Sequence, residues 1–182
     1  MKHGEMKKKR ITELNRLSVE EFKCADKIPL VVILDDVRSL NNIGSIFRAA
    51  DAFRVEKVYL CGISASPPHP DIHKTALGAE FSVEWEHCSD VCGAISACRD
   101  KGYKICAIEQ ANGSVELSQF IISQDDKYAV VLGNEVKGVR QEAVNMCDEC
   151  IEIAQYGTKH SLNVSITAGI VIWEFFNKMK KN

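Results

Sequence analysis

The chain has 182 residues and a formal net charge of −2; 46% of the residues are hydrophobic and 26% are charged. This length fits one domain with a sizeable buried core, and the composition is ordinary for a globular protein. The longest apolar runs are far shorter than the roughly twenty residues that cross a bilayer. No apolar signal core follows the amino-terminal MKHGEMKKKR, so we expect a cytoplasmic protein without a membrane partner.

Positive charge is concentrated at the two ends of the chain. Residues 1–16 carry a net charge of +4 and residues 174–182 a net charge of +2, which leaves −8 for residues 17–173. Basic ends on an acidic body attract polyanions, although such lysines can also serve solubility alone. The overall charge argues against a surface that binds nucleic acid on every side.

Eight cysteines are more than a chain of this kind usually carries. A chain of this size does not need a disulfide framework, so we expect reduced thiols. Cys88 and Cys92 form one pair, Cys147 and Cys150 another, and a zinc site would require the two pairs to meet. Their spacing is looser than that of most structural zinc sites, and the histidines of segment 69–73 sit on a loop, so we expect no metal.

Apolar β-branched runs alternate with amphipathic segments along the chain. Residues 1–28 are polar and basic, and we expect them to form a helical extension ahead of the main domain, residues 29–182. In that domain the patterns predict strands at 30–36, 57–63, 81–85, 103–109, 128–133 and 150–155, and helices at 42–53, 74–80, 89–101, 140–147 and 162–178. Segment 64–71 contains three prolines and is predicted to be irregular.

This alternation predicts the α/β class, with a mostly parallel sheet and helices on both faces. Ligands of such sheets bind beyond the carboxyl ends of the strands. The candidate functional loops are therefore 36–42, 109–114, 133–139 and 155–161.

Common nucleotide and hydrolase motifs are poorly supported. Gly133 and Gly138 have the spacing of a phosphate-binding loop, but Val139 stands where that loop needs lysine. No G-x-G-x-x-G follows a predicted strand, and Ser161 lacks the G-x-S-x-G context of a nucleophile elbow.

The remaining candidates are polar residues in otherwise apolar surroundings: Asn42, Arg48, Asn134, Glu135, Ser161 and Asn163. Each also has a structural interpretation. Asn42 and Ser161 could cap helices, and Glu135 could be loop surface. Asn163 is predicted inside a helix buried on most sides, where its amide must be hydrogen-bonded.

Arg48 falls on a different side of its predicted helix from the apolar residues. It lies beside a stripe of small residues, Ser45, Ala49 and Ala52. This placement fits either an ordinary solvent-facing arginine or a functional one.

Three segments taken together favour function: NNIGSIFRAA (41–50), VVLGNEVKGV (130–139) and IAQYGTKHSLNVSITAGI (153–170). In order and spacing they closely resemble the three motifs of the SpoU/TrmH family, which are S-adenosylmethionine-dependent RNA ribose 2′-O-methyltransferases of the SPOUT superfamily. TALGAE (75–80) is also similar to a family feature, and the resemblance covers about residues 29–178. It implies a catalytic domain over 29–182, a C-terminal trefoil knot, a homodimer and S-adenosylmethionine as the cofactor.

The resemblance also implies site residues. By position, the family's cofactor pocket corresponds to Leu132, Gly133, Ile153, Leu162, Ala107 and Glu109, largely through their backbone. The family's polar catalytic positions correspond to Asn42, Arg48, Glu135, Ser161 and Asn163. Ala154 and Gln155 depart from the proline and methionine that are common in the third motif, and Thr167 from alanine. Because the contact expected of Ile153 is a backbone contact, we expect the pocket to survive.

Our hypothesis is that Arg48 clamps the phosphate beside the target ribose, although the family's arginine has also been proposed as the base. Arginine carries a planar fork that suits phosphate, and it normally stays protonated. Asn42, Ser161 and Asn163 would orient groups by hydrogen bonds, and Glu135 would fix its loop or a partner's arginine.

The expected partner is RNA, with no DNA partner. We expect tRNA rather than rRNA, because only the basic segment 1–28 is available as a further RNA-binding element. An RNA-binding SPOUT protein without activity, and an enzyme that methylates a base nitrogen, stay open as alternatives.

Overall fold

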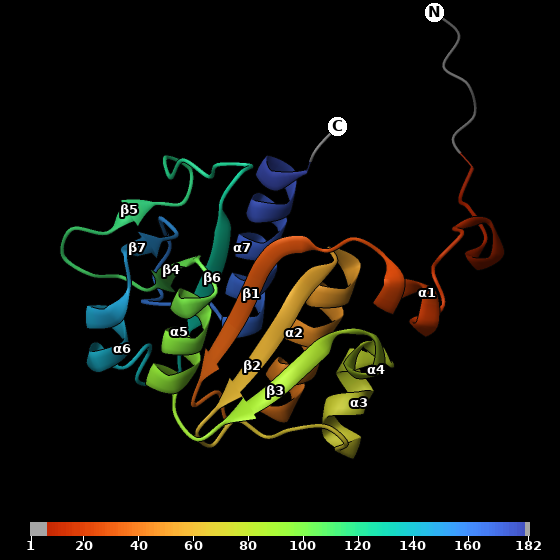
Figure 1. The fold of residues 1–182 in the computed structure, drawn as a ribbon, viewed down its shortest axis with the longest axis horizontal. Coiled ribbons are helices and arrows are strands. Elements are labelled where there is room, and N and C mark those ends of the chain that lie inside the picture. Colours follow the sequence, from red (N-terminus) through yellow and green to blue (C-terminus); the bar gives the residue numbers. More distant parts are fainter. Residues whose placement is uncertain (1–6, 181–182) are drawn as a thin grey trace, which may run out of the picture.

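The computed structural model describes residues 7–180, which form one seven-stranded sheet covered by helices (Figure 1). The strands are β1 (Ile28–Asp35), β2 (Val55–Cys61), β3 (Glu84–Cys88), β4 (Tyr103–Ile108), β5 (Val115–Glu116), β6 (Lys127–Leu132) and β7 (Glu149–Glu152). Their order across the sheet is β3-β2-β1-β6-β4-β7-β5, and every neighbouring pair is parallel.

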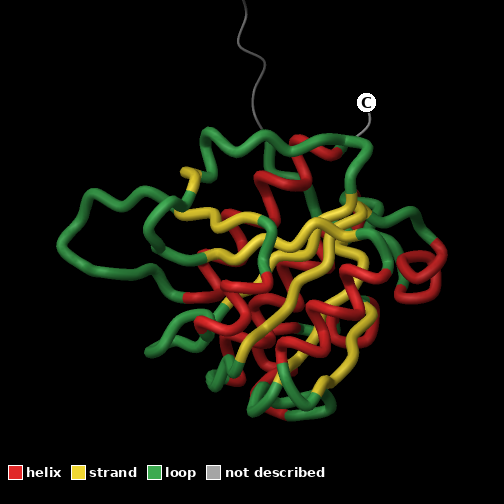
Figure 2. The backbone as a smooth tube through the Cα atoms, turned by 60° about the vertical axis from the view of Figure 1, so that its left-hand side comes forward, coloured by secondary structure: helices red, strands yellow, loops and turns green. Residues whose placement is uncertain are grey.

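The helices cover both faces of this sheet and so create two cores. The α-helices are α1 (Val19–Cys24), α2 (Leu40–Ala52), α3 (Pro70–Ala76), α4 (Ala79–Ser82), α5 (Val91–Asp100), α6 (Gln141–Met146) and α7 (Val164–Met179). Buried side chains of α2, α3 and α7 pack on one face, and those of α5 and α6 on the other. Figure 2 follows the strands side by side with helices packed against them. The predicted α/β class is confirmed.

Successive side chains of the central strands point to opposite faces of the sheet, and this explains why there are two cores. In β1, Leu30, Val32 and Leu34 belong to the first core, whereas Val31 and Ile33 belong to the second. A strand that is apolar at every position can be satisfied only when both faces of its sheet are covered.

Contact between α2 and α3 depends on a glycine. A Cβ atom at Gly44 would lie 2.1 Å from Thr75 Oγ1 and 2.3 Å from the carbonyl oxygen of Ile72. In return, Thr75 Oγ1 donates a hydrogen bond to the carbonyl oxygen of Asn41 at 3.0 Å. The two helices can therefore approach this closely because position 44 has no side chain.

The predicted strand 81–85 is wrong in its first half, because α4 occupies 79–82 and β3 begins at Glu84. Gly78, with a φ of 98°, turns the chain from α3 into α4. Ser82 Oγ then donates to the carbonyl oxygen of Ala79 at 3.1 Å, a local bond that competes with an extended conformation. The predicted irregular segment 64–71 also ends early, because Pro70 starts α3.

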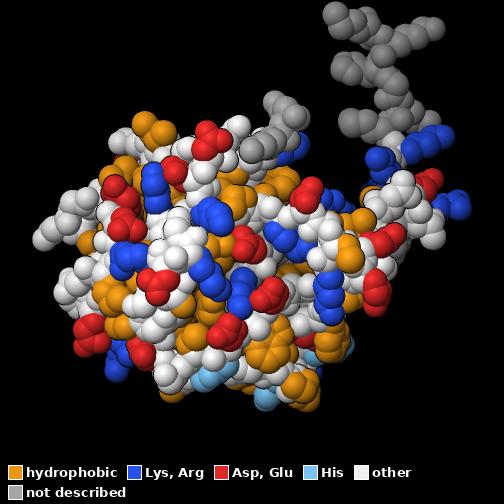
Figure 3. Space-filling model, viewed as in Figure 1, with side chains coloured by type: hydrophobic (Ala, Val, Ile, Leu, Met, Phe, Trp, Pro, Cys, Tyr) orange, Lys and Arg blue, Asp and Glu red, His pale blue; other side chains and the backbone are white. Residues whose placement is uncertain are grey.

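The predicted helical extension 1–28 is helical only in part over its described residues. A 3₁₀ turn spans Ile11–Glu13, and α1 spans Val19–Cys24. Asn15 adopts a φ of 44°, which interrupts a continuous helix between them. Figure 3 shows Lys and Arg side chains on the described part of this segment that stands out from the body of the molecule, whereas Phe22 of α1 is buried in the core. None of the helices over residues 7–180 is long and apolar enough to cross a membrane.

Candidate active site

A cavity of about 660 Å³ opens beyond the carboxyl ends of β4, β6 and β7. Its lining comes from three segments that are far apart in sequence: 108–110, 132–139 and part of 152–167. Parallel strands bring their carboxyl ends to one edge of the sheet, so the loops after β4, β6 and β7 meet there. Three of the four loops predicted from the sequence therefore border this cavity.

Most of the residues predicted for the cofactor line the cavity, namely Glu109, Leu132, Gly133, Ile153 and Leu162. Ala107 does not, since it is fully buried inside β4. It lies in register with Val131 of β6 and Cys150 of β7, so its backbone is paired on both sides inside the sheet rather than exposed at the carboxyl end of the strands.

The loop 133–139 is a tight turn closed on itself. The amide of Asn134 donates to the carbonyl oxygen of Gly138 at 3.1 Å, and the amide of Gly138 donates back at 2.9 Å. The backbone crowds Gly133, where a Cβ atom would lie 2.0 Å from the carbonyl carbon of Gly138 and 2.1 Å from the nitrogen of Val139. Gly133 is therefore required for this loop to close.

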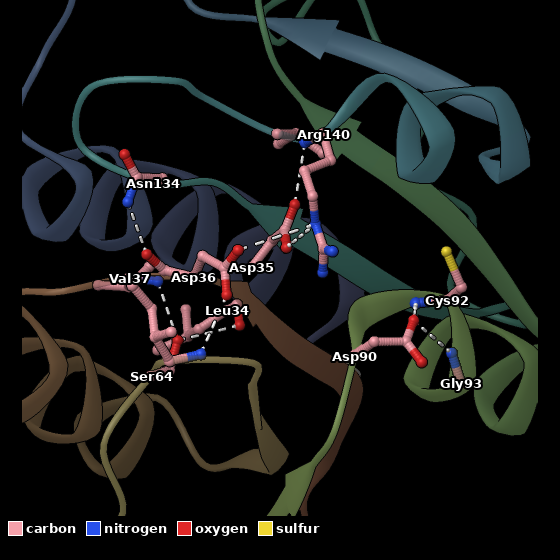
Figure 4. Close-up of polar contacts among 12 residues, drawn as sticks. Leu34, Asp35, Asp36, Val37, Ser64, Asp90, Cys92, Gly93, Asn134 and Arg140 are labelled. Carbon is pink, nitrogen blue, oxygen red and sulfur yellow. Dashed lines mark hydrogen bonds and ion pairs between the residues drawn. The ribbon is translucent and has the colours of Figure 1, made fainter.

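Two carboxylates hold the far end of this loop. Glu109 Oε2 accepts from the amide of Val139 at 3.0 Å. Asp35, at the end of β1 and fully buried, accepts from the amide and from Nε of Arg140, each at 2.9 Å (Figure 4). Asn134 adds a third tie by donating from Nδ2 to the carbonyl oxygen of Asp36 at 2.8 Å. Hydrogen bonds within the protein thus fix the loop to the ends of β1 and β4.

A chain of side-chain hydrogen bonds connects the three motif segments. Glu135 accepts from the amides of Arg38 at 3.0 Å and Ser39 at 2.9 Å, and from Asn42 Nδ2 at 3.0 Å. Asn163 Nδ2 donates to Asn42 Oδ1 at 3.1 Å. Partial burial would raise the pKa of Glu135, but these donors lower it below its ordinary value overall. Three predicted residues from distant parts of the chain therefore form one network.

The structure contradicts three structural interpretations offered from the sequence: Asn42 as a cap, Asn163 as a buried amide and Ser161 as a cap. Ser39, not Asn42, caps α2, because Ser39 Oγ accepts from the amide of Asn42 at 3.3 Å. Asn163 is the exposed N-cap of α7 rather than a buried amide, and its Oδ1 accepts from the amide of Ser165 at 2.8 Å. Ser161 is therefore not the cap; it is exposed and lines the cavity.

Arg48 stands apart from the cavity of its own chain. It lies on α2 six residues after Asn42, which is about 9 Å along a helix axis. Its side chain is exposed, forms no hydrogen bond or ion pair with another residue of 7–180, and does not line the cavity. Within one chain, the structure brings Asn42, Glu135 and Asn163 together and leaves Arg48 out.

Some site residues escaped prediction. Gln110 lines the cavity and donates from Nε2 to the carbonyl oxygen of His160 at 2.9 Å, so it ties the loop after β4 to the loop after β7. Asp35 and Arg140 were also missed. A carboxylate that ends an apolar strand was the available signal for Asp35, since a buried charge needs a partner.

The cysteines of the chain are all free thiols. Over residues 7–180, no cluster of three or more His, Cys, Asp and Glu side chains has an arrangement that could hold a metal ion. Burial raises the pKa of Cys98 to about 11 and that of Cys147 to about 12.

Comparison with known proteins relates this geometry to one family. Residues 29–173 match the model of the SpoU rRNA Methylase family. The chain is 27% identical over 171 residues to the 23S rRNA (guanosine-2′-O-)-methyltransferase RlmB of Vibrio cholerae, covering 93% of this chain and 68% of that protein. It is 29% identical to the protein of the same name from Neisseria meningitidis, covering 80% of this chain and 57% of that protein. The chain therefore spans roughly two thirds or less of the lengths of these relatives.

Solved structures agree in fold. An AdoMet-bound rRNA methyltransferase from Sinorhizobium meliloti superimposes with a TM-score of 0.77 at 26% identity, over 88% of this chain and 61% of that one. The TrmH/SpoU tRNA modifying enzyme of A. aeolicus gives a TM-score of 0.75 at 27% identity, over 88% of this chain and 79% of that one. Because the family model matches most of the chain, this protein belongs to the SpoU methylase family.

Proposed function

We propose that this protein is an S-adenosylmethionine-dependent RNA methyltransferase that modifies a ribose 2′-hydroxyl. The observation that supports this most strongly is the cavity whose walls are built from the motif segments. The hydrogen bonds from Glu135 through Asn42 to Asn163 join the first motif segment (41–50), on α2, to that cavity. The named activity of the Vibrio relative, guanosine-2′-O-methylation of rRNA, is of the same reaction class.

The cavity suits S-adenosylmethionine. Its volume of about 660 Å³ lies in the range of small-molecule sites. Leu132, Ile153 and Leu162 offer apolar surface for an adenine ring, and the backbone of the loop at Gly133 can approach a ligand closely. When bound, the cofactor supplies a methyl group on a sulfonium centre, already activated for transfer. The solved Sinorhizobium relative holds AdoMet.

The task left to this chain is to orient the 2′-hydroxyl and to favour the loss of its proton. Ser161 and Asn163 border the cavity and present hydroxyl and amide groups to a ribose. Arg48 of a second copy of the chain contacts the phosphate next to that ribose through its planar fork, which stabilises the developing negative charge on oxygen. Glu135 acts on the protein itself, because it fixes the start of α2 against the loop 133–139.

We infer that two copies complete the site. Ile166, Ile170 and Trp173 follow one another at helical spacing on α7 and are 55%, 38% and 50% exposed. Trp173 packs on Phe53 at the end of α2, with ring centroids 5.3 Å apart, so this apolar face is continuous with the helix that carries Arg48. A second copy that covers this face would bring its Arg48 near the cavity that lacks one. The knotted C-terminal topology is inferred from family membership.

The substrate is RNA in the cytoplasm. We propose tRNA as the first substrate to test and rRNA as the alternative, and the relatives' names support both.

The proposed function is tested by methyl transfer from radiolabelled S-adenosylmethionine to separate tRNA and rRNA fractions. Product nucleotides should resist alkaline cleavage, because a 2′-O-methyl group removes the attacking hydroxyl. Arg48→Ala should abolish transfer but keep cofactor binding in calorimetry, and Arg54→Gln, which removes an exposed cation at the end of the same helix, should transfer normally. Near-normal turnover by Arg48→Ala would refute the assigned role, and absence of cofactor binding by the unaltered protein would refute the proposed function. Light scattering checks the dimer.

A further inference from the structure

The mouth of the cavity carries an unusually exposed aromatic residue. Tyr156 lies in the loop between β7 and α7 and is 93% exposed, the largest exposed fraction among the large hydrophobic residues of 7–180. Gln155 before it and His160 after it both line the cavity. The loop that carries Tyr156 therefore forms part of the cavity rim.

The rim is held in place and extends to a second loop. Gln110 Nε2 binds the carbonyl oxygen of His160 at 2.9 Å, which anchors the Tyr156 loop to the strand β4 side of the cavity. Val136, on the loop 133–139, is 82% exposed and also lines the cavity. Apolar surface thus lies on two loops that border the same opening.

Two cations accompany these apolar side chains. Lys137 follows Val136 directly, and Lys159 is three residues beyond Tyr156. Both lysines are exposed, and neither side chain forms a hydrogen bond or ion pair with another residue of the described part of the chain. An exposed aromatic ring and unpaired cations on loops that border one opening are a combination that binds single-stranded nucleic acid, because bases stack on the ring and lysines attract phosphates.

We propose that Tyr156 is the platform on which an unpaired nucleobase of the RNA stacks, with Lys137 and Lys159 contacting the adjoining phosphates. This inference rests on the proposed function and narrows its substrate class to nucleotides in single-stranded loops. A base inside a duplex is already stacked on its neighbours and cannot present its face to a side chain. Stacking on an aromatic ring tolerates any base, so Tyr156 positions the nucleotide without selecting its identity.

The test measures RNA affinity by fluorescence anisotropy with the full chain. The probes are a fluorescein-labelled RNA hairpin with a single-stranded loop and a blunt duplex of the same stem sequence. Tyr156→Ala should weaken hairpin binding about 5- to 150-fold and change duplex binding little. Tyr156→Phe keeps the ring and should bind the hairpin like the unaltered protein. Lys159→Gln should weaken the binding of both the hairpin and the duplex, and it should reduce the salt dependence of binding.

A matched control is Ile121→Ala, which removes a side chain that is 87% exposed but lies outside the cavity lining. It should leave both affinities unchanged, and S-adenosylmethionine affinity measured by calorimetry should stay the same in every variant. The inference is overturned if Tyr156→Ala binds the hairpin normally, or if Tyr156→Phe loses as much hairpin affinity as Tyr156→Ala. It is also overturned if the affinity of Tyr156→Ala for S-adenosylmethionine falls together with its affinity for the hairpin. If one of these results occurs while the unaltered protein still methylates RNA, only the role of Tyr156 is refuted and the proposed function stands. If the unaltered protein binds neither RNA, both the role of Tyr156 and the proposed function are refuted.

Discussion

The ion pair between Asp35 and Arg140 gives a quantitative test of how the loop 133–139 is held. Asp35 is fully buried, and its two oxygens accept from the amide and Nε of Arg140 at 2.9 Å each. Arg140 Nη2 is also buried and has no hydrogen-bond partner over residues 7–180. Substituting Asp35 by alanine leaves both Arg140 donors without their acceptor and removes a tie between β1 and the loop 133–139.

The expected loss in the free energy of unfolding follows from the burial of the two partners. Removing one member of a fully buried pair costs about 3–5 kcal/mol. The Arg140 side chain is 36% exposed, so water replaces part of the lost interaction, and we expect about 2–3 kcal/mol for Asp35→Ala. Asp35→Asn keeps one acceptor oxygen and should cost less. The double variant Asp35→Ala/Arg140→Ala should cost less than the sum of the single changes, by about 1–2 kcal/mol.

Urea unfolding followed by circular dichroism, at one fixed protein concentration, gives these free energies of unfolding. Glu86→Ala is the matched control, because Glu86 pairs with Lys57 at 2.8 Å but its side chain is 54% exposed; its cost should lie within about 1 kcal/mol. Calorimetry should show weaker S-adenosylmethionine binding by Asp35→Ala, since Arg140 directly follows the loop that lines the cavity. A cost for Asp35→Ala within about 0.5 kcal/mol of zero, or strict additivity in the double variant, would refute this reasoning.

Protonation of Glu135 at low pH should weaken the hydrogen bonds that its carboxylate accepts. Its pKa is lower in the folded protein than the ordinary 4.5, so its contribution to stability is fully present above about pH 4.5 and is lost as the pH falls through the folded value. The difference in unfolding free energy between the unaltered protein and Glu135→Gln should therefore shrink below pH 4.5, and a constant difference down to pH 3 would contradict the assignment. Thiol reactivity should follow burial: Cys24 is exposed, whereas burial raises the pKa of Cys98 to about 11 and holds those of Cys61 and Cys106 far above their ordinary value. With Ellman's reagent at pH 7, Cys24 should react in the native protein and the other three only after denaturation; rapid native labelling of Cys61 or Cys106 would contradict this.

Local pattern predicted much of the fold. Runs such as LVVIL (30–34) are apolar at every position and rich in β-branched residues, so they identify central strands of a sheet covered on both faces. The parallel order then assigns the functional loops to the carboxyl ends of the strands. The motif residues Glu135, Asn42 and Asn163 were also predicted, and they do form one hydrogen-bonded network. Local pattern was insufficient at 81–85, where a glycine turn and a serine side chain favour a helical turn over a strand.

The sequence by itself determined the class, most of the strands and the segments that build the site, because periodicity and motif order are properties of neighbouring residues. It missed the short strand β5. Tertiary structure decided which partners those residues meet: Asp35 with Arg140, Glu109 with the loop at Val139, and Gly44 with the backbone of α3. It also placed Arg48 outside the cavity of its own chain, although the sequence put it in the same motif as Asn42. The physical reason is helix geometry, since two residues six positions apart on one helix point to different sides and face different neighbours once the helix is packed.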